Sequence, residues 1–202
     1  MGYKVFACAR RVEIIEDYNK ENIIPVKLDI TDPESIKYFK QKILNQKIDI
    51  LVNCAGGMHV EQKNNTLDYS MEDLNITFSL NTSGTFEIIK NVVPMMNKDE
   101  FPIIITLSSV AGKLYRKIPL PYFIGKSSES ELLKYLGLSL HPIRFVDLVI
   151  STVNSFEKEN MKDNSMSPED IFNIVKFICA SPPYLAIDEM HVRHVNSGGA
   201  FA

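Results

Sequence analysis

The apolar residues of this chain fall into short runs separated by longer amphipathic stretches. Six runs bounded by polar or turn residues are typical of buried strands, over 3–9, 24–28, 48–52, 102–107, 143–149 and 187–192. Between the runs, apolar residues recur at helical spacing, as Ile36, Phe39 and Ile43 do after the second run. Strands that alternate with helices of this length predict a parallel sheet covered by helices on both faces.

Helix starts are marked by side chains that can cap the first turn. Such residues stand at three places, Asp32, Ser70 and Ser167. The helix after Ser70 is expected to run from about 71 to 96, with a kink before Pro94. Two further helices are expected over 12–19 and 122–136, whereas the polar stretch 154–166 predicts a flexible segment.

Composition narrows the class of protein. The chain has 202 residues, of which 45% are apolar and 23% charged, as in a soluble globular protein, and we expect one domain over 1–202. A net charge of −3 without a basic patch argues against nucleic-acid binding. The 3 cysteines suggest neither a disulfide framework nor a metal site, and no apolar run is long enough to span a membrane. We therefore expect a cytoplasmic protein with no membrane partner and no metal.

One stretch carries recognisable chemistry. Tyr122 and Lys126 are four residues apart in a predicted helix, so both side chains lie on one face. An ammonium beside a phenol favours the phenolate form, which can exchange a proton with a carbonyl or carbinol oxygen. Ser109 lies thirteen residues upstream, just past a strand. A second such pair, Tyr38 and Lys42, has no serine in that place, and we interpret it as two ordinary positions on an amphipathic helix.

The spacing of Ser109, Tyr122 and Lys126 resembles that of the short-chain dehydrogenase/reductase family. Two further segments agree with it in order and distance. Asn53-Cys54-Ala55-Gly56 resembles the family's Asn-Asn-Ala-Gly turn, with Cys54 as a departure, and the segment from Asn81 to Gly84 resembles its Asn-x-x-Gly helix segment.

This resemblance implies an oxidoreductase that interconverts a carbonyl and an alcohol of a small molecule by hydride transfer. Tyr122 would be the general acid in reduction and the base in oxidation. Lys126 would bind the nicotinamide ribose, Ser109 would orient and polarise the substrate oxygen, and Asn81 would hold a water that relays protons. Ser108, next to Ser109, is interpreted as structural.

The resemblance also implies cofactor contacts. They would come from Arg10, Arg11, Asp29, Asn53, Ala55, Gly56, Tyr122, Lys126, Val153 and Ser155. Arg10 and Arg11 follow the first strand of this chain, which resembles the family's second strand. A guanidinium at that place suits a ribose 2′-phosphate, so the two arginines favour NADP(H) over NAD(H). Two alternatives stay open, that both arginines are merely solvated and that Asp29 only caps a turn. The family's Pro-Gly is replaced by Ile150-Ser151, which puts the geometry of the loop before Val153 in doubt.

The largest departure is at the beginning of the chain. The family starts with a strand and a Gly-x-x-x-Gly-x-Gly turn, whereas residues 2–11 already resemble its second strand. We therefore expect an α/β, doubly wound parallel sheet (Rossmann-like) of one domain whose first strand-helix unit is missing. Our hypothesis is that the sequence is a fragment, an alternative start or a shortened gene model.

Two consequences of the resemblance concern assembly and activity. The family commonly forms homodimers or homotetramers through long helices, here near 71–96 and 122–136. A rival function, favoured by the absent glycine turn, is that of a catalytically impaired relative acting as a scaffold or regulatory binding protein.

Overall fold

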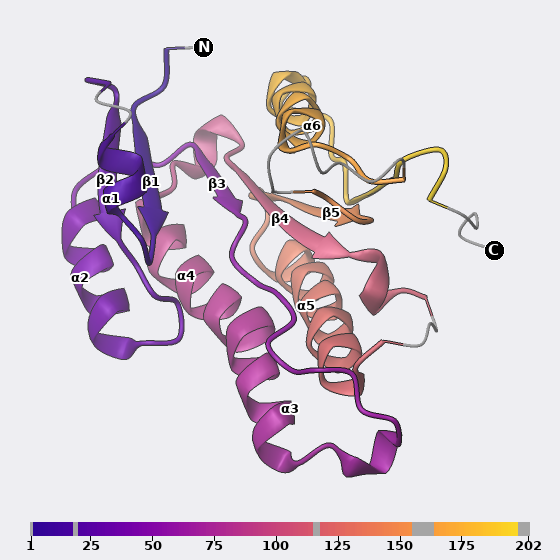
Figure 1. Ribbon diagram of the computed structural model, residues 1–202. Coiled ribbons are helices and arrows are strands. Elements are labelled where there is room, and N and C mark those ends of the chain that lie inside the picture. The colour runs from indigo at the N-terminus through magenta and orange to yellow at the C-terminus, as the bar shows by residue number, and fades with distance from the viewer. Residues whose placement is uncertain (1, 18–19, 115–117, 155–163, 198–202) are drawn as a thin grey trace.

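The computed structural model describes residues 2–17, 20–114, 118–154 and 164–197 (Figure 1). Among these residues there are six strands, β1 (Val5–Ala9), β2 (Ile23–Lys27), β3 (Ile50–Asn53), β4 (Ile103–Ser109), β5 (Arg144–Ile150) and β6 (Glu189–Val192). Each strand overlaps one of the six apolar runs, so the prediction of the strands is confirmed. The flexible segment predicted over 154–166 lies largely outside the described residues.

The helices lie between the strands, as expected. They are α1 (Glu13–Glu16), α2 (Pro33–Ile43), α3 (Met71–Phe78), α4 (Gly84–Val92), α5 (Leu120–Ser139) and α6 (Pro168–Ala180). All three predicted caps are confirmed, because Asp32, Ser70 and Ser167 each accept a hydrogen bond from a backbone N–H of the first turn. No helix of the described ranges combines the length and the apolarity needed to cross a membrane.

Two predicted helices differ from those observed. The helix expected over 12–19 is only α1, because Val12 offers no capping side chain and no residue of α1 is buried. The helix expected over 71–96 is divided by a π-helical turn, η2 (Ser79–Ser83), between α3 and α4. Ordinary helical hydrogen bonding stops there, and π turns of this kind are frequent at functional sites. The expected kink before Pro94 is where α4 ends and a 3₁₀ turn (Val93–Met95) begins.

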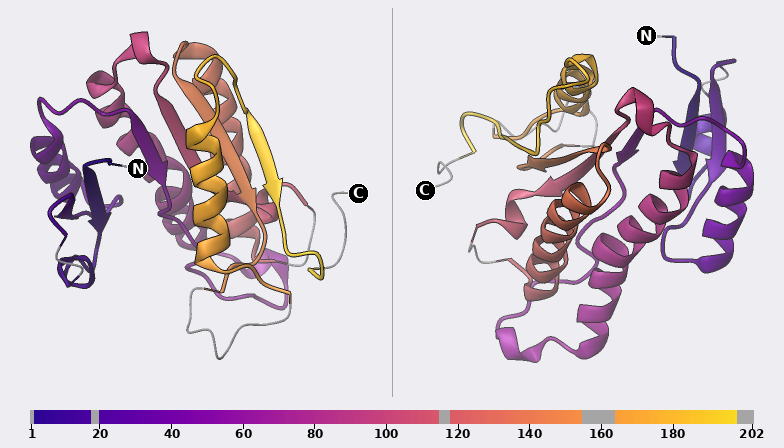
Figure 2. Two further views of the ribbon diagram at one scale, coloured as in Figure 1. Left: turned by 90° about the horizontal axis from the view of Figure 1, so that it is seen from above. Right: turned by 180° about the vertical axis from the view of Figure 1, so that it is seen from behind.

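All strand pairs are parallel, but the sheet is in two parts. β1 pairs with β2, and β3, β4, β5 and β6 form a second sheet in that order (Figure 2). β1 and β3 therefore each have a ladder partner on one side. Val5 on β1 and Val52 on β3 are exposed as a result, at 43% and 37%. The break in the sheet therefore lies between β1 and β3.

Helices cover both faces of the four-stranded sheet. α4 and α5 pack on one face and α6 on the other, as the two orientations of Figure 2 show. The alternation along β4 follows this layering, since Ile104 belongs to the core on the α5 side whereas Ile103 and Ile105 belong to the core under α6. α2 and β2 contribute to the first core, which joins the two sheets through side chains. The segments that carry the candidate site lie at the carboxyl ends of β3 and β4.

Candidate active site

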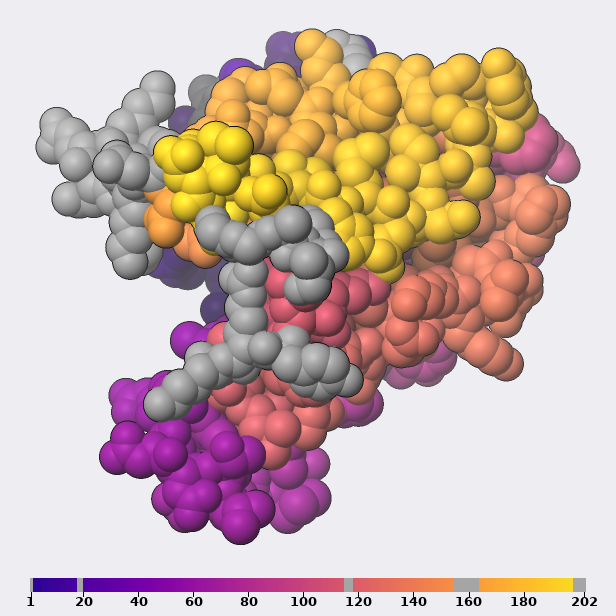
Figure 3. Space-filling view, turned by 90° about the vertical axis from the view of Figure 1, so that its right-hand side faces the viewer, coloured from indigo at the N-terminus to yellow at the C-terminus, as the bar shows by residue number. Residues whose placement is uncertain are grey.

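The candidate catalytic residues come from three segments near the carboxyl edge of the sheet. Ser109 ends β4, Asn81 lies in η2, and Tyr122 and Lys126 are in the first two turns of α5. Carboxyl ends of parallel strands are where ligands bind in doubly wound folds. On the face drawn in Figure 3, purple residues around the start of α3 lie next to the pink and salmon residues that join β4 to α5.

The turn after β3 closes directly on Asn81 and Lys126. Gly56 has a φ of +146°, and a Cβ at this position would lie 2.9 Å from both Asn81 Oδ1 and Lys126 Nζ. Asn81 Oδ1 accepts a hydrogen bond from the Gly57 N–H (2.9 Å), and its Nδ2 donates to the carbonyls of Gly57 (3.0 Å) and Thr77 (2.9 Å). The turn after β3 and the helix segment are therefore one unit, which a side chain at Gly56 would force apart.

Lys126 is held as a buried cation. Its side chain is 4% exposed, and Nζ donates to Glu129 Oε2 at 2.7 Å and to the Leu107 carbonyl at 3.3 Å. An ammonium has three N–H groups, and within the described residues the third has no acceptor. The ammonium is thus fixed from two sides and keeps one donor for a ligand.

The loop that carries Ser109 docks on α5 beside Lys126. Ser109 Oγ accepts a hydrogen bond from the Ala111 N–H (3.1 Å), which starts a 3₁₀ turn over Val110–Gly112. A Cβ on Gly112 would lie 2.6 Å from the backbone carbon of Lys126, so the backbone of this turn touches the helix. Ser127 Oγ also donates to the Gly112 carbonyl at 2.8 Å. This close approach sets the position of Ser109 relative to α5.

Tyr122 lies in the first turn of α5 and is partly buried. Its backbone N–H donates to the Pro119 carbonyl (3.0 Å), whereas its hydroxyl makes no hydrogen bond to any described residue. No hydrogen bond joins Tyr122 to Ser109 or Lys126 within those ranges either. The side chain is placed on the same helix as Lys126 with its hydroxyl uncommitted.

Ser108 has a structural role, as expected. Its Oγ and that of Ser130 both donate to the carboxylate of Asp147, which is 2% exposed on β5. Lys113 Nζ lies 3.2 Å from the same carboxylate. This network ties β4, β5 and α5 together behind Ser109.

The residues expected near the adenosine end lie after β1 and β2. Arg10 and Arg11 are exposed directly after β1. Asp29 accepts hydrogen bonds from Thr31 Oγ1 (2.7 Å) and the Thr31 N–H (2.9 Å), so it caps a turn, the alternative left open above. These hydrogen bonds, aided by the nearby charge of Arg10, lower the pKa of Asp29 below its ordinary value. Arg10 and Asp29 thus share one corner of the molecule.

The remaining predicted cofactor contacts differ in what they do. Asn53 is buried, and its Nδ2 donates to Thr106 Oγ1 at 3.1 Å, which joins the ends of β3 and β4. Ala55 is exposed on the turn. Val153 pairs with Met166 in an isolated bridge. Ser155 lies outside the described residues.

The sequence analysis missed Glu129. Its side chain is fully buried, and it contacts Lys126 through Oε2 and Thr85 Oγ1 through Oε1 at 3.0 Å. A signal was available, because Lys126, Glu129, Leu133 and Leu136 recur at the spacing of one buried helix face. An acid on an apolar face needs partners, and here one of them is the candidate catalytic lysine.

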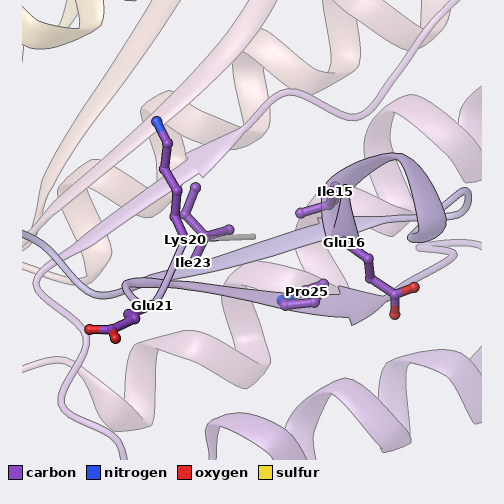
Figure 4. A pocket seen from close by; sticks show the side chains of 6 residues that line it. All are labelled: Ile15, Glu16, Lys20, Glu21, Ile23 and Pro25. Atoms are coloured by element: carbon purple, nitrogen blue, oxygen red, sulfur yellow. The ribbon is translucent and has the colours of Figure 1, made fainter. Parts of the chain in front are cut away.

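Two hollows of the described surface lie away from the candidate site. One of about 280 Å³ lies beside α1 and β2, lined by Ile15, Glu16, Lys20, Glu21, Ile23 and Pro25 (Figure 4). The other lies at the amino ends of β3, β4 and β5, opposite the candidate site. Neither contains a residue assigned to catalysis. Within the described ranges, no three His, Cys, Asp or Glu side chains are grouped so as to hold a metal ion.

Comparison with known proteins identifies the family. The family model described as short chain dehydrogenase matches residues 1–164. The chain therefore belongs to the short chain dehydrogenase family, as the spacing of its motifs indicated.

Two curated relatives and one solved structure show the extent of the similarity. The chain is 27% identical over 181 residues to an NADPH-dependent 1-acyldihydroxyacetone phosphate reductase of Saccharomyces cerevisiae, covering 85% of this chain and 59% of the relative. It is 28% identical over 190 residues to a 3-oxoacyl-(acyl-carrier-protein) reductase of Aquifex aeolicus, covering 86% and 75%. An alcohol dehydrogenase from Thermococcus sibiricus complexed with 5-hydroxy-NADP superposes with a TM-score of 0.82 at 19% identity, covering 98% and 89%.

The family model shows the family, and the solved structure shows the fold. The chain spans only 59% of the length of the yeast reductase. The relatives are reductases by name, and their substrates and cofactors are properties of those proteins.

Proposed function

We propose that this protein is an oxidoreductase that uses NADP(H) to interconvert a carbonyl and an alcohol of a small molecule by hydride transfer. The observation that carries the proposal is that the turn after β3 meets Asn81 and Lys126. Gly57 of this turn is hydrogen-bonded to Asn81, and Gly56 lies close to both side chains. Ser109 is docked beside this unit, and Tyr122 leaves its hydroxyl uncommitted on the same helix.

The residues present fit the nicotinamide end of a dinucleotide. Lys126 keeps one N–H for a ribose hydroxyl, next to the turn that contains Gly56 at the carboxyl edge of the sheet. The bound nicotinamide would supply or accept the hydride. Arg10 and Arg11 are both exposed, and Arg10 lies near Asp29; the two guanidinium groups suit the 2′-phosphate of NADP(H). The described residues contain no glycine-rich phosphate turn, so we assign none of them to the pyrophosphate.

The chain's own side chains would then move one proton. In reduction, Tyr122 donates its phenolic proton to the substrate oxygen, and the Lys126 ammonium stabilises the phenolate that remains. Ser109 donates a hydrogen bond to the same oxygen and so orients it. Asn81, with both amide donors used for Gly57 and Thr77, keeps the turn with Gly56 in place. In oxidation the proton moves the other way.

NADPH binding tests the proposal directly. Fluorescence titration of the chain with NADPH should give saturable binding, and NADH should bind more weakly. Replacing both Arg10 and Arg11 by alanine should weaken NADPH while leaving NADH unchanged, because only the 2′-phosphate contact is lost. Equal losses for the two cofactors would contradict the assignment of the arginines.

The second candidate is a catalytically impaired relative that acts as a scaffold or regulatory binding protein. The break between β1 and β3, together with the absence of a phosphate-binding turn from the described residues, favours it. In that case NADPH would show no binding up to millimolar concentration. Saturable binding followed by turnover of a carbonyl substrate would rule it out.

A further inference from the structure

Glu129 and Lys126 form an ion pair of an unusual kind for a helix. On α5, the pair Glu131–Lys134 has the same three-residue spacing and the same 2.7 Å distance, but its side chains are 71% and 51% exposed. The Lys126–Glu129 pair is 4% and 0% exposed. A buried ion pair is weak support for stability, because removing two charges from water costs about as much as their attraction returns. A role beyond holding the helix together is therefore indicated.

The contacts of Glu129 leave open where one proton lies. Thr85 Oγ1 is 3.0 Å from two oxygens, the Asn81 carbonyl and Glu129 Oε1. A threonine hydroxyl has one hydrogen to donate, and a carbonyl oxygen has none. If Thr85 donates to Asn81, its contact with Glu129 requires a proton on Oε1. If Thr85 donates to Glu129, Oε1 needs no proton, and a carboxylate can accept from both Thr85 and Lys126. The same positions of the heavy atoms accommodate both states.

The surroundings of Glu129 affect its pKa in both directions, and on balance they favour the protonated carboxyl. Burial raises the pKa of this carboxyl, while the Lys126 ammonium and the hydrogen bond to Thr85 lower it. Asp147 on β5 adds a raising influence, and Lys113 lies 3.2 Å from Asp147. The net pKa of Glu129 is raised above its ordinary value. From α4, Glu129 contacts the neutral hydroxyl of Thr85, which also contacts the Asn81 carbonyl.

We propose that Glu129 is a positioning residue that takes up a proton at Oε1 and so sets how much of the Lys126 charge is neutralised beside the active site. A hydronium ion of the solvent gives up the proton, and an O–H bond forms at Glu129 Oε1. The Thr85 hydroxyl then turns from Glu129 to the Asn81 carbonyl and accepts a hydrogen bond from the new O–H. The Lys126 ammonium keeps its hydrogen bond to Oε2, so the pair changes from a net charge of zero to one positive charge. The inference rests on the proposed function, in which Lys126 acts on Tyr122.

The proton can be observed without turnover. In the chain labelled with ¹³C at the glutamate carboxyl, one signal should titrate above the exposed glutamates and vanish in Glu129→Gln. The same signal should shift in Lys126→Met and in Thr85→Val, since each change removes one of its two partners. If the signal titrates with the exposed glutamates, or is unaffected by Lys126→Met, the proposal is overturned. Because Thr85→Val preserves side-chain shape, it serves if Glu129→Gln does not fold.

Kinetics then test the effect on the site. Glu129→Gln should lower kcat by about tenfold and move a limb of the pH profile, while KM for the carbonyl substrate stays near that of the parent. Glu131→Gln, which changes the exposed pair, should alter neither. An unchanged pH profile in folded Glu129→Gln would overturn the role. If the parent has no turnover, the proposed function fails, whereas the carboxyl titration still decides whether Glu129 takes up the proton.

Discussion

Two Tyr-x-x-x-Lys pairs in this protein have the same spacing and opposite surroundings. On α2, Lys42 Nζ lies over the ring of Tyr38, 5.1 Å from its centroid, and Tyr38 is 45% exposed. On α5, Lys126 is buried and bonded to Glu129 and Leu107. Helical spacing puts two side chains on one face in both cases. The approach of other segments turns one pair into a candidate site and leaves the other as a surface cation–π contact.

The largest effect expected from this contrast is on turnover. Tyr122→Phe should lower kcat by roughly 10²- to 10⁴-fold, because the proton donor is removed while the ring remains. NADPH binding should be retained. Steady-state NADPH oxidation with a panel of carbonyl compounds measures the loss, and Tyr38→Phe is the matched control. Undiminished turnover in Tyr122→Phe would break the distinction between the two pairs.

Stability should separate the two lysines next. Lys126→Met leaves the carboxyl of Glu129 buried without its cation and should cost about 3 kcal/mol of unfolding free energy, at the low end because Glu129 can take up a proton. Lys42→Met should change it by no more than about 0.5 kcal/mol. Urea unfolding followed by circular dichroism gives both values. Similar values for the two variants would mean that burial does not distinguish the pairs.

The glycines that let segments approach α5 provide the third test. Gly112→Ala places a Cβ 2.6 Å from the Lys126 backbone and should destabilise the protein by about 2 kcal/mol, since that backbone would have to move. Gly137 lies on α5 itself, and a Cβ there would have its closest contact at 3.5 Å. Gly137→Ala should therefore be neutral or stabilise by up to about 1 kcal/mol. The two melting curves should shift in different directions or by clearly different amounts.

The smallest expected effect is the pH dependence that Glu129 adds to stability. Its pKa is raised in the folded chain, so the folded state holds more protons than the unfolded state between the two values. The contribution is present below the unfolded pKa of about 4.3 and is lost as pH rises through the raised folded value, by about 1.4 kcal/mol per pH unit for one proton. Glu129→Gln should flatten this part of the profile. Glu131→Gln should leave it unchanged, and a slope that persists in Glu129→Gln would assign it to another group.

Local patterns in the sequence were sufficient for much of the fold. The caps at Asp32, Ser70 and Ser167 fixed the beginnings of α2, α3 and α6, because capping depends on residues within one turn. The π-helical turn was not foreseen. Asn81 and Thr82 there bond to Gly57 and to the Gly125 carbonyl, contacts between segments far apart in the chain.

The candidate site was predicted in its residue types and in part of its geometry. Spacing indicated Ser109, Tyr122 and Lys126. The structure adds the close approach of Gly56 and Gly112 to Lys126. Glu129 was not predicted, because its carboxyl is buried inside the protein and the motifs of the chain mark groups that face a substrate. A carboxyl that acts on the lysine from inside the protein is visible only as an acid on an apolar helix face.

The break between β1 and β3 also bears on how the molecule unfolds. Hydrogen bonds of a ladder do not cross it, so the β1–β2 pair is joined to the rest by packing in the shared core, to which Val26 of β2 and Ile104 of β4 both belong. Contacts of that kind are lost without breaking a ladder. The two sheets are therefore separate units of local opening, and backbone amides of β2 should exchange with solvent earlier than those of β4. The two sheets are therefore coupled by apolar packing and not by backbone hydrogen bonds of a ladder.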